Sequence, residues 1–219
     1  MKAVIVAGGE PLPADKAQLA GADFLVAADA GATWLVDAGA VPDVLVGDMD
    51  SIPDDLFAEL QRAGVVIERH AGDKDASDAE LAVDRAVARG ADQVVVIGAL
   101  GGERLDHELA NLLLLADPTW PATPLDLSLV RGGTSARAVH GGGRLELRGA
   151  VGDLVTLLPL NGDAEGVLTD GLRFTLEGEP LRLGRSRGLS NVVERAPASV
   201  SLERGTLLVI ESSREGESQ

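Results

Sequence analysis

Acidic and glycine-rich clusters follow short apolar runs at four places in the first half of this 219-residue chain. In order, they are Asp29-Ala-Gly31, Gly47-Asp-Met-Asp-Ser51, Asp73-Lys-Asp-Ala-Ser-Asp78 and Gly101-Gly-Glu-Arg-Leu-Asp-His107. If the apolar runs are parallel strands, these clusters gather at the carboxyl edge of one sheet, where open α/β folds bind ligands. Carboxylates crowded on one edge repel each other unless a cation is bound. The arrangement predicts magnesium and a phosphorylated substrate.

The second and third clusters supply the carboxylates. Asp48 and Asp50 stand two residues apart in a turn, a spacing at which both can reach one Mg²⁺ ion, although Asp is also common in ordinary turns. Asp73, Asp75 and Asp78 surround Lys74 at the start of an expected helix. One helix cap needs a single acceptor, so this surplus indicates metal for the acids and phosphate for Lys74.

The fourth cluster has the residues expected around phosphate. Gly101 and Gly102 permit close approach of the backbone, and the Arg104 guanidinium matches a phosphate group. Asp106 and His107 follow in the first turn of the next expected helix, where a histidine more often orients its neighbours than performs chemistry.

Several enzyme classes are excluded because the chain lacks the motifs or residues that they require. The string His107-Glu108-Leu-Ala-Asn111 differs from the zinc-protease pattern H-E-x-x-H at its second ligand. The chain contains neither a G-x-x-x-x-G-K-[ST] phosphate loop nor a G-x-G-x-x-G dinucleotide loop after its first strand. It has no Cys, which excludes thiolate nucleophiles and Cys-ligated zinc.

These clusters require a mostly parallel sheet with flanking helices. Short Val/Ile/Leu runs alternate with Ala-rich stretches, which predicts an α/β domain over residues 1–132. Strands are expected at 3–7, 23–28, 43–46, 65–68, 93–98 and 126–130. Helices are expected at 14–20, 31–38, 53–63, 78–89 and 105–116, and Ser77 with Glu80 forms a capping box for the fourth of these.

The pattern changes after Arg131. Brief β-like runs separated by Gly, Asp, Asn and Pro predict an all-β sandwich or barrel over residues 140–212, and residues 213–219 form a polar tail.

The net charge of −16 argues against a nucleic-acid surface. The apolar stretch after Met1-Lys2 is too short for a secretory segment, and no run reaches the ~20 residues that span a bilayer, so we expect a cytoplasmic protein.

Taken in order, Asp29-Ala-Gly31, Gly47-Asp-Met-Asp-Ser51, Lys74-Asp-Ala-Ser-Asp78 and Arg104-Leu-Asp-His107 resemble the thiamine pyrophosphokinase family. The later Gly171-Leu-Arg-Phe174 and Leu183-Gly-Arg-Ser-Arg-Gly-Leu-Ser-Asn191 look like that family's thiamine-binding β-domain. The resemblance implies a C-terminal β-sandwich that binds thiamine and forms the dimer. It also implies a homodimer whose active sites lie between the first domain of one subunit and the second domain of the other.

Site residues carried over by this resemblance form three groups. Mg²⁺ would be bound by Asp48, Asp50 and Asp78, with Asp29, Asp73 and Asp75 nearby. The phosphates of ATP would be bound by Arg104, Asp106 and Lys74, and Ser77 and His107 belong to the same nucleotide motifs. Thiamine would be contacted by Ser190, Asn191 and Phe174. Compared with the family pattern, Glu103 is one extra residue before Arg104, and Ser77 stands where Thr is common.

The reaction implied by the resemblance is transfer of pyrophosphate from ATP to the thiamine hydroxyl, with release of AMP. Catalysis would depend on positioning and charge neutralisation, with Asp48, Asp50, Asp75, Asp78 and Arg104 as the catalytic set. Either Asp78 or Asp50 would accept the hydroxyl proton. Three alternatives stay open: a pyrophosphokinase for another hydroxymethyl heterocycle such as a pterin, a non-catalytic thiamine- or nucleotide-binding protein, and a metal-dependent phosphohydrolase.

Overall fold

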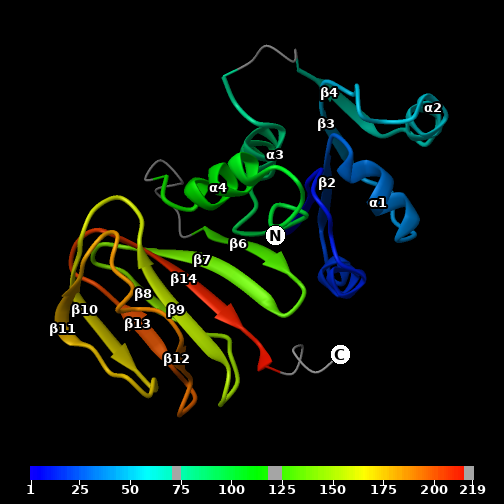
Figure 1. Ribbon diagram of the computed structural model, residues 1–219. Helices are drawn as coiled ribbons and strands as arrows, with labels where there is room; N and C mark the ends of the chain where they lie inside the picture. Colours follow the sequence, from blue (N-terminus) through cyan, green and yellow to red (C-terminus); the bar gives the residue numbers. More distant parts are fainter. Residues whose placement is uncertain (71–74, 118–124, 215–219) are drawn as a thin grey trace. The chain divides into compact units, whose positions relative to one another are not determined.

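The computed structural model describes residues 1–70, 75–117 and 125–214. It divides into two compact units, which are labelled by their helices and strands in Figure 1. Among the described residues, the first unit contains 1–111 and 125–132, and the second contains 112–117 and 133–214. No helix in these described ranges is both long enough and apolar enough to cross a membrane.

A parallel sheet forms the centre of the first unit. Its strands are β1 (Lys2–Val6), β2 (Phe24–Ala28), β3 (Val44–Gly47), β4 (Val66–Arg69), β5 (Gln93–Ile97) and β6 (Asp126–Arg131). They lie in the order β6-β5-β1-β2-β3-β4, and every neighbouring pair is parallel. All six carboxyl ends therefore meet at one edge. The strand order reverses between β1 and β5, which is where open α/β sheets bind ligands.

The helices η1 (Pro13–Leu19), α1 (Gly31–Asp37), α2 (Asp54–Arg62) and α3 (Asp78–Ala88) belong to the first unit, as do residues 105–111 of α4 (Leu105–Leu114). At the start of α3 the Ser77 hydroxyl accepts a hydrogen bond from the Glu80 backbone N–H at 3.1 Å, which is the Ser77 half of the predicted capping box. The segment expected as a helix over 14–20 is a 3₁₀-helix. Its buried Asp15 accepts hydrogen bonds from the backbone N–H groups of Leu12 and Gly132, so this turn is tied to the end of β6.

Small aliphatic side chains fill the core of the first unit. Both faces of the central strands are buried, as expected for a parallel sheet covered by helices. One cluster combines β1, β5 and α1 through Val4, Val6, Leu35, Val95 and Ile97. A second combines Ala27 and Leu45 with Leu60 of α2. The predicted α/β domain is confirmed, and the core is made of Ala, Val, Leu and Ile because the chain has so few aromatic residues.

The second unit is a sandwich of two antiparallel sheets. One layer is formed by β12 (Asn191–Val192), β9 (Leu154–Pro159), β14 (Thr206–Ser212) and β7 (Thr134–His140), which are neighbours in that order within a ten-stranded sheet. The other contains β11 (Glu177–Leu181), β10 (Ala164–Asp170), β13 (Ser199–Ser201) and β8 (Arg144–Glu146). Alternate side chains of both sheets point into one shared core, and Figure 1 shows the two sheets as separate layers. The predicted C-terminal β-sandwich is confirmed.

A buried ion pair fixes one end of this sandwich. The Arg137 guanidinium of β7 donates to Glu211 of β14 at 2.5 Å, and both side chains are almost completely buried. The other Glu211 oxygen accepts from the backbone N–H groups of Arg148 and Gly149, at 2.6 and 2.8 Å. Arg137 also donates to the Glu146 carbonyl oxygen. The pair therefore joins two strands of one sheet to the turn that follows β8.

Candidate active site at the carboxyl edge of the parallel sheet

A cavity of about 480 Å³ lies where the carboxyl ends of β1, β2 and β5 meet, within the first unit. It is lined by the turns that follow these strands and by the first turns of α3 and α4. The lining residues that matter for chemistry are Gly8, Gly9, Asp29, Ser51, Ser77, Asp78, Gly98, Gly101, Arg104, His107 and Asn111. The volume is in the range for small-molecule sites, roughly 300–1,000 Å³.

Three carboxylates converge beside this cavity. One oxygen each from Asp29, Asp48 and Asp50 lies within 4.8 Å of the other two. The Ser51 hydroxyl links two of them, since it contacts Asp29 Oδ2 and lies 3.0 Å from Asp50 Oδ1. Asp48 Oδ1 accepts from the backbone N–H of Asp50 at 3.1 Å, which closes the turn and brings both aspartates to the same side.

Asp29 is the most constrained member of the group. Its backbone is in the left-handed region with φ of 48°, an uncommon conformation for a residue with a side chain. Its Oδ1 atom is buried and has no hydrogen-bond partner among the described residues. Burial raises the pKa of Asp29, and the charges of Asp48, Asp78 and Asp50 raise it further, against the opposing effect of the Ser51 hydrogen bond. A buried, unpartnered oxygen in a ring of acids matches the donor set that Mg²⁺ prefers.

Asp78 lies at the edge of this carboxylate group. It is the first residue of α3, and its charge acts on the pKa of Asp29. Gly47 separates the two, because a Cβ on Gly47 would lie 3.3 Å from Asp78 Oδ1 and 3.2 Å from Asp29 Cβ. The φ of Gly47 is 148°, which side chains rarely adopt, so glycine is required both for the backbone and for the approach of the two acids.

The expected metal ligands and the observed group overlap without being identical. Asp48 and Asp50 lie together as the turn spacing predicted. Asp29, expected only nearby, replaces Asp78 as the third member of the close group. The left-handed backbone that directs Asp29 inward has no signature in the sequence. Asp75 is exposed, whereas the predicted Asp73 and Lys74 lie outside the described residues.

Glycine turns form the wall of the cavity opposite the acids. The Gly9 N–H donates to the Gly98 carbonyl oxygen at 3.0 Å, which joins the turn after β1 to the turn after β5. A Cβ on Gly9 would lie 2.3 Å from that oxygen, so no larger residue fits here. Bare backbone at the switch point leaves room for a polyphosphate to approach closely.

Arg104 and Asp106 form an ion pair at the rim. Arg104 donates through Nε and Nη2 to the two oxygens of Asp106, at 2.9 and 2.6 Å. This pairing lowers the pKa of Asp106 well below its usual range. Both side chains are two-thirds exposed, so the guanidinium is accessible to an anion. Arg104 lines the cavity, while Asp106 turns its carboxylate to Arg104.

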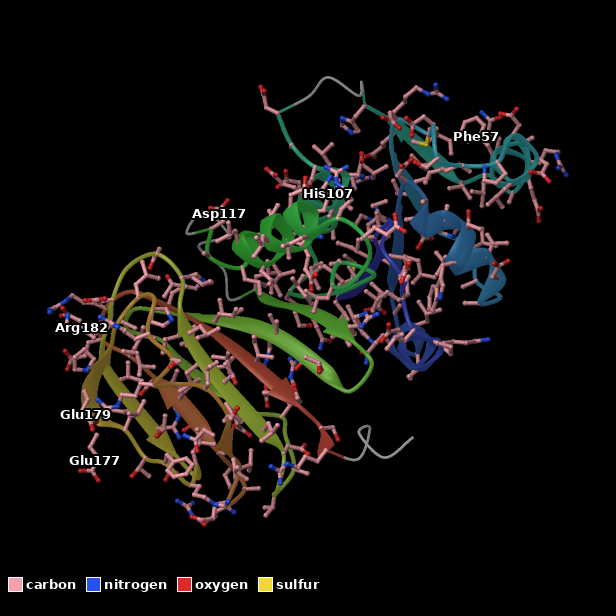
Figure 2. The ribbon with its side chains drawn as sticks, viewed as in Figure 1. Phe57, His107, Asp117, Glu177, Glu179 and Arg182 are labelled. Atoms are coloured by element: carbon pink, nitrogen blue, oxygen red, sulfur yellow. The ribbon has the colours of Figure 1, made fainter. Side chains whose placement is uncertain are left out.

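The start of α4 supplies the remaining polar residues. His107, which is labelled in Figure 2, is on the first turn of α4. It is one of the residues that line the cavity. One turn later, buried Asn111 donates from Nδ2 to the Ala99 carbonyl oxygen at 2.9 Å. Asn111 thus fixes the turn after β5 on the cavity wall. No pattern of residue types singles out Asn111, apart from its position in the string that resembles the zinc-protease motif.

The residues expected at the thiamine site belong to the second unit. Phe174 is 64% exposed. Ser190 is exposed, has a left-handed backbone with φ of 56°, and donates its N–H to Thr156 Oγ1 at 3.1 Å. Asn191, the third residue expected to contact thiamine, has a buried side chain that is hydrogen-bonded to the backbone of Phe174.

Sequence comparisons match both units. A family model described as the catalytic domain of thiamin pyrophosphokinase matches residues 16–124, and one described as its vitamin B1 binding domain matches residues 144–207. The thiamine pyrophosphokinase of Bacillus subtilis is 26% identical over 188 residues, which are 86% of this chain and 86% of that protein. Thiamine pyrophosphokinase 1 of Arabidopsis thaliana is 28% identical over 187 residues, 80% of this chain and 67% of that protein.

Solved structures share the fold. The crystal structure of thiamine pyrophosphokinase from Bacillus subtilis matches with a TM-score of 0.86 at 24% identity, over 98% of this chain and 100% of that one. The enzyme from Geobacillus thermodenitrificans matches with a TM-score of 0.79 at 27% identity, over 97% and 98% of the two chains. The family models cover, in the same order, the parallel-sheet unit with its acidic cavity and the β-sandwich. The chain therefore belongs to the thiamine pyrophosphokinase family.

Proposed function

We propose that this protein transfers the pyrophosphoryl group of ATP to the hydroxyl of thiamine, giving thiamine diphosphate and AMP. The observation that carries the proposal is the pairing of a catalytic-domain match with a vitamin B1 binding match in one chain. The acidic, glycine-walled cavity supports the same chemistry. The vitamin B1 match favours thiamine over a pterin-like heterocycle.

The donor set of the first unit fits a magnesium ion. Asp29, Asp48 and Asp50 would hold it, with Asp78 at the edge of the group. When bound, the ion would offset the repulsion among these acids and neutralise charge on the phosphates. The buried, unpartnered Oδ1 of Asp29 is the structural feature that most directly supports a cation here.

ATP would bind with its phosphates between the glycine turns and Arg104. Gly8 and Gly9 leave the backbone open to the phosphates, and the Arg104 fork would hold phosphate oxygens in place of the Asp106 carboxylate. Asp106 would then keep Arg104 at the rim between turnovers. Lys74 is proposed as a further phosphate ligand on the basis of its motif.

The chemical step would be a direct displacement. The thiamine hydroxyl oxygen forms a bond to the β-phosphorus of ATP, and the bond from that phosphorus to the oxygen bridging the α- and β-phosphates breaks, so AMP leaves with that oxygen. The hydroxyl proton passes to a carboxylate, either Asp78, which lines the cavity, or Asp50, which belongs to the close group with Asp29. Catalysis then depends on alignment and on charge compensation, without a covalent enzyme intermediate.

We also propose that the working form is a homodimer with each active site between the first unit of one subunit and the second unit of the other. Both units expose apolar side chains that an interface would cover. On α4, Leu105 and Leu109 of the first unit are more than half exposed and share one face at an interval of four residues, and Leu113, which the division assigns to the second unit, continues that face. On the second unit, Leu168, Leu183 and Leu189 are about half exposed.

A substrate panel tests the assignment against its alternatives. Purified protein would be incubated with ATP and Mg²⁺ and with thiamine, a hydroxymethylpterin or no acceptor, and AMP and inorganic phosphate would be measured. We expect AMP with thiamine alone. AMP with the pterin alone would support the related pyrophosphokinase, phosphate without any acceptor would support a phosphohydrolase, and ligand binding without either product would support a non-catalytic binding protein.

A further inference from the structure

Phe174 has an unusual position in the vitamin-binding part of the chain. Residues 144–207 contain no other Phe, Trp or Tyr, and Phe174 is 64% exposed. The other phenylalanines behave differently, since Phe24 is buried and Phe57 packs against a core cluster of the first unit. A lone exposed ring offers a flat apolar face to a heterocycle, provided that its backbone is held in one orientation.

The side-chain amide of Asn191 fixes the backbone of Phe174 through hydrogen bonds. Its Oδ1 accepts from the Phe174 backbone N–H at 3.0 Å, and its Nδ2 donates to the Phe174 carbonyl oxygen at 2.8 Å. Oδ1 also accepts from the Val192 N–H at 2.9 Å. Because two partners are N–H donors and one is a carbonyl acceptor, the orientation of the amide is fixed by backbone chemistry. The amide thus pairs with both polar groups of Phe174, as a residue opposite it in an antiparallel ladder would.

Asn191 is itself firmly anchored. It is 7% exposed and lies on β12, where it pairs with Val155 of β9. Backbone contacts beside Asn191 join the same two segments. Arg173 donates its N–H to the Val192 carbonyl oxygen at 2.9 Å, and Leu172 forms a β-bridge with Val193. The short segment that carries Phe174 is therefore attached to the sandwich through Asn191 and its neighbours.

We propose that Asn191 is a positioning residue that holds the Phe174 ring for stacking against the thiamine ring system, rather than a residue that contacts thiamine. The inference rests on the proposed function. All three of the hydrogen bonds given above go to the protein backbone, and the side chain has little surface left for a ligand. A polar amide can be buried without a large cost only when it is hydrogen-bonded. The hydrogen bonds to the segment that carries Phe174 therefore explain why the Asn191 amide is buried.

A double-mutant cycle tests this role. If Asn191 acts through Phe174, Asn191→Ala raises the KM for thiamine roughly tenfold and leaves the KM for ATP within about twofold. In a Phe174→Ala background the same substitution then changes the thiamine KM by no more than about twofold. Asn161→Ala, at an exposed asparagine of the same unit, is the matched control and keeps both KM values. If the effects of Asn191→Ala and Phe174→Ala multiply in the double variant, Asn191 contacts thiamine directly and the proposal is wrong.

Hydrogen exchange on the unmodified protein gives a second test that does not require a variant to fold. The Phe174 amide lies in an exposed segment, yet its bond to buried Asn191 predicts exchange as slow as that of the Val192 amide. Exchange at the rate of an unprotected amide would overturn the proposal. Absence of pyrophosphoryl transfer with normal protection of Phe174 would instead contradict the proposed function while leaving the hold on Phe174 intact.

Discussion

Asp29 lies in surroundings that disfavour its negative charge. Its pKa is raised from 3.8, first by burial and then by the charges of Asp48, Asp78 and Asp50. Without a cation the folded protein therefore retains the Asp29 proton to higher pH than the unfolded chain does. The unfolded state binds fewer protons in the window above 3.8, so the stability of the metal-free protein falls as pH rises through that window.

Neutralising Asp29 is expected to stabilise the metal-free protein. Asp29→Asn removes a buried charge and keeps an oxygen that can accept from Ser51, so its Tm in EDTA at about pH 7 exceeds that of the unmodified protein. Excess Mg²⁺ should raise the Tm of the unmodified protein more than that of the variant. Asp37→Asn, at an exposed position of α1, is the control and changes neither value. A variant less stable than the unmodified protein in EDTA would contradict the acidic-repulsion account.

Arg104 should matter for activity and little for stability. Arg104→Lys keeps the charge and loses the two-pronged donor, so kcat/KM for ATP falls about tenfold or more. The Tm stays nearly constant, because the pair with Asp106 is well exposed to solvent. Steady-state kinetics with ATP as the varied substrate gives the first value and thermal unfolding the second. Unchanged kcat/KM would exclude Arg104 from phosphate binding.

Spacing alone predicts a part of this site. Asp48 and Asp50 lie together because a tight turn leaves little conformational freedom to the backbone between them. Asp29 enters the close group through its left-handed φ, and Asn191 is directed at Phe174 by pairing between β12 and β9. Both depend on backbone conformation and on contacts distant in sequence, which residue types and local patterns do not reveal.

Among the elements, α3 connects local sequence to the site most directly. Ser77 caps it and Asp78 is its first residue, so the cap of the helix and a carboxylate of the site are adjacent in the sequence. Ser77→Ala is expected to lower stability by about 1 kcal/mol, as loss of an N-cap does, whereas Ser77→Thr keeps the acceptor and most of the stability. Denaturant unfolding measures both, and equal stability of the Ala and Thr variants would argue against the cap.

The Arg137–Glu211 pair is the corresponding feature of the sandwich. Glu211→Ala leaves a buried guanidinium without its partner and the N–H groups of Arg148 and Gly149 without an acceptor. We expect a loss of about 3–5 kcal/mol in the free energy of unfolding of this unit. Glu165→Ala, which breaks an exposed ion pair with Arg204, should cost less than about 1 kcal/mol. Similar losses for the two variants would show that burial does not determine the effect.

Sequence patterns predicted the elements well where hydrophobic periodicity is strong. The six strands of the first unit lie within one or two residues of their expected bounds. The stretch at 14–20 is a 3₁₀-helix because Pro13 begins it and Asp15 is drawn inward to Gly132. The pairing order of the short strands in the second unit could not be predicted, since it is set by contacts between distant segments.

At the scale of the whole molecule, the proposed dimer makes the exposed face of α4 functional. Leu109→Glu places a charge in the middle of that face, so we expect a shift from dimer to monomer in sedimentation velocity and a matching loss of activity. Val41→Glu, at an equally exposed valine of the first unit, is the control and leaves the dimer unchanged. A Leu109→Glu variant that remains dimeric and active would remove α4 from the interface.

The proposed reaction at the acidic edge of the parallel sheet transfers an intact pyrophosphoryl group from ATP to thiamine. The most direct measurement follows AMP and thiamine diphosphate together, with ATP, thiamine and Mg²⁺ supplied to the unmodified protein and to Asp48→Asn. The unmodified protein should form the two products in equal amounts, and the folded variant should form neither. ADP in place of AMP, or turnover by the variant equal to that of the unmodified protein, would contradict the account.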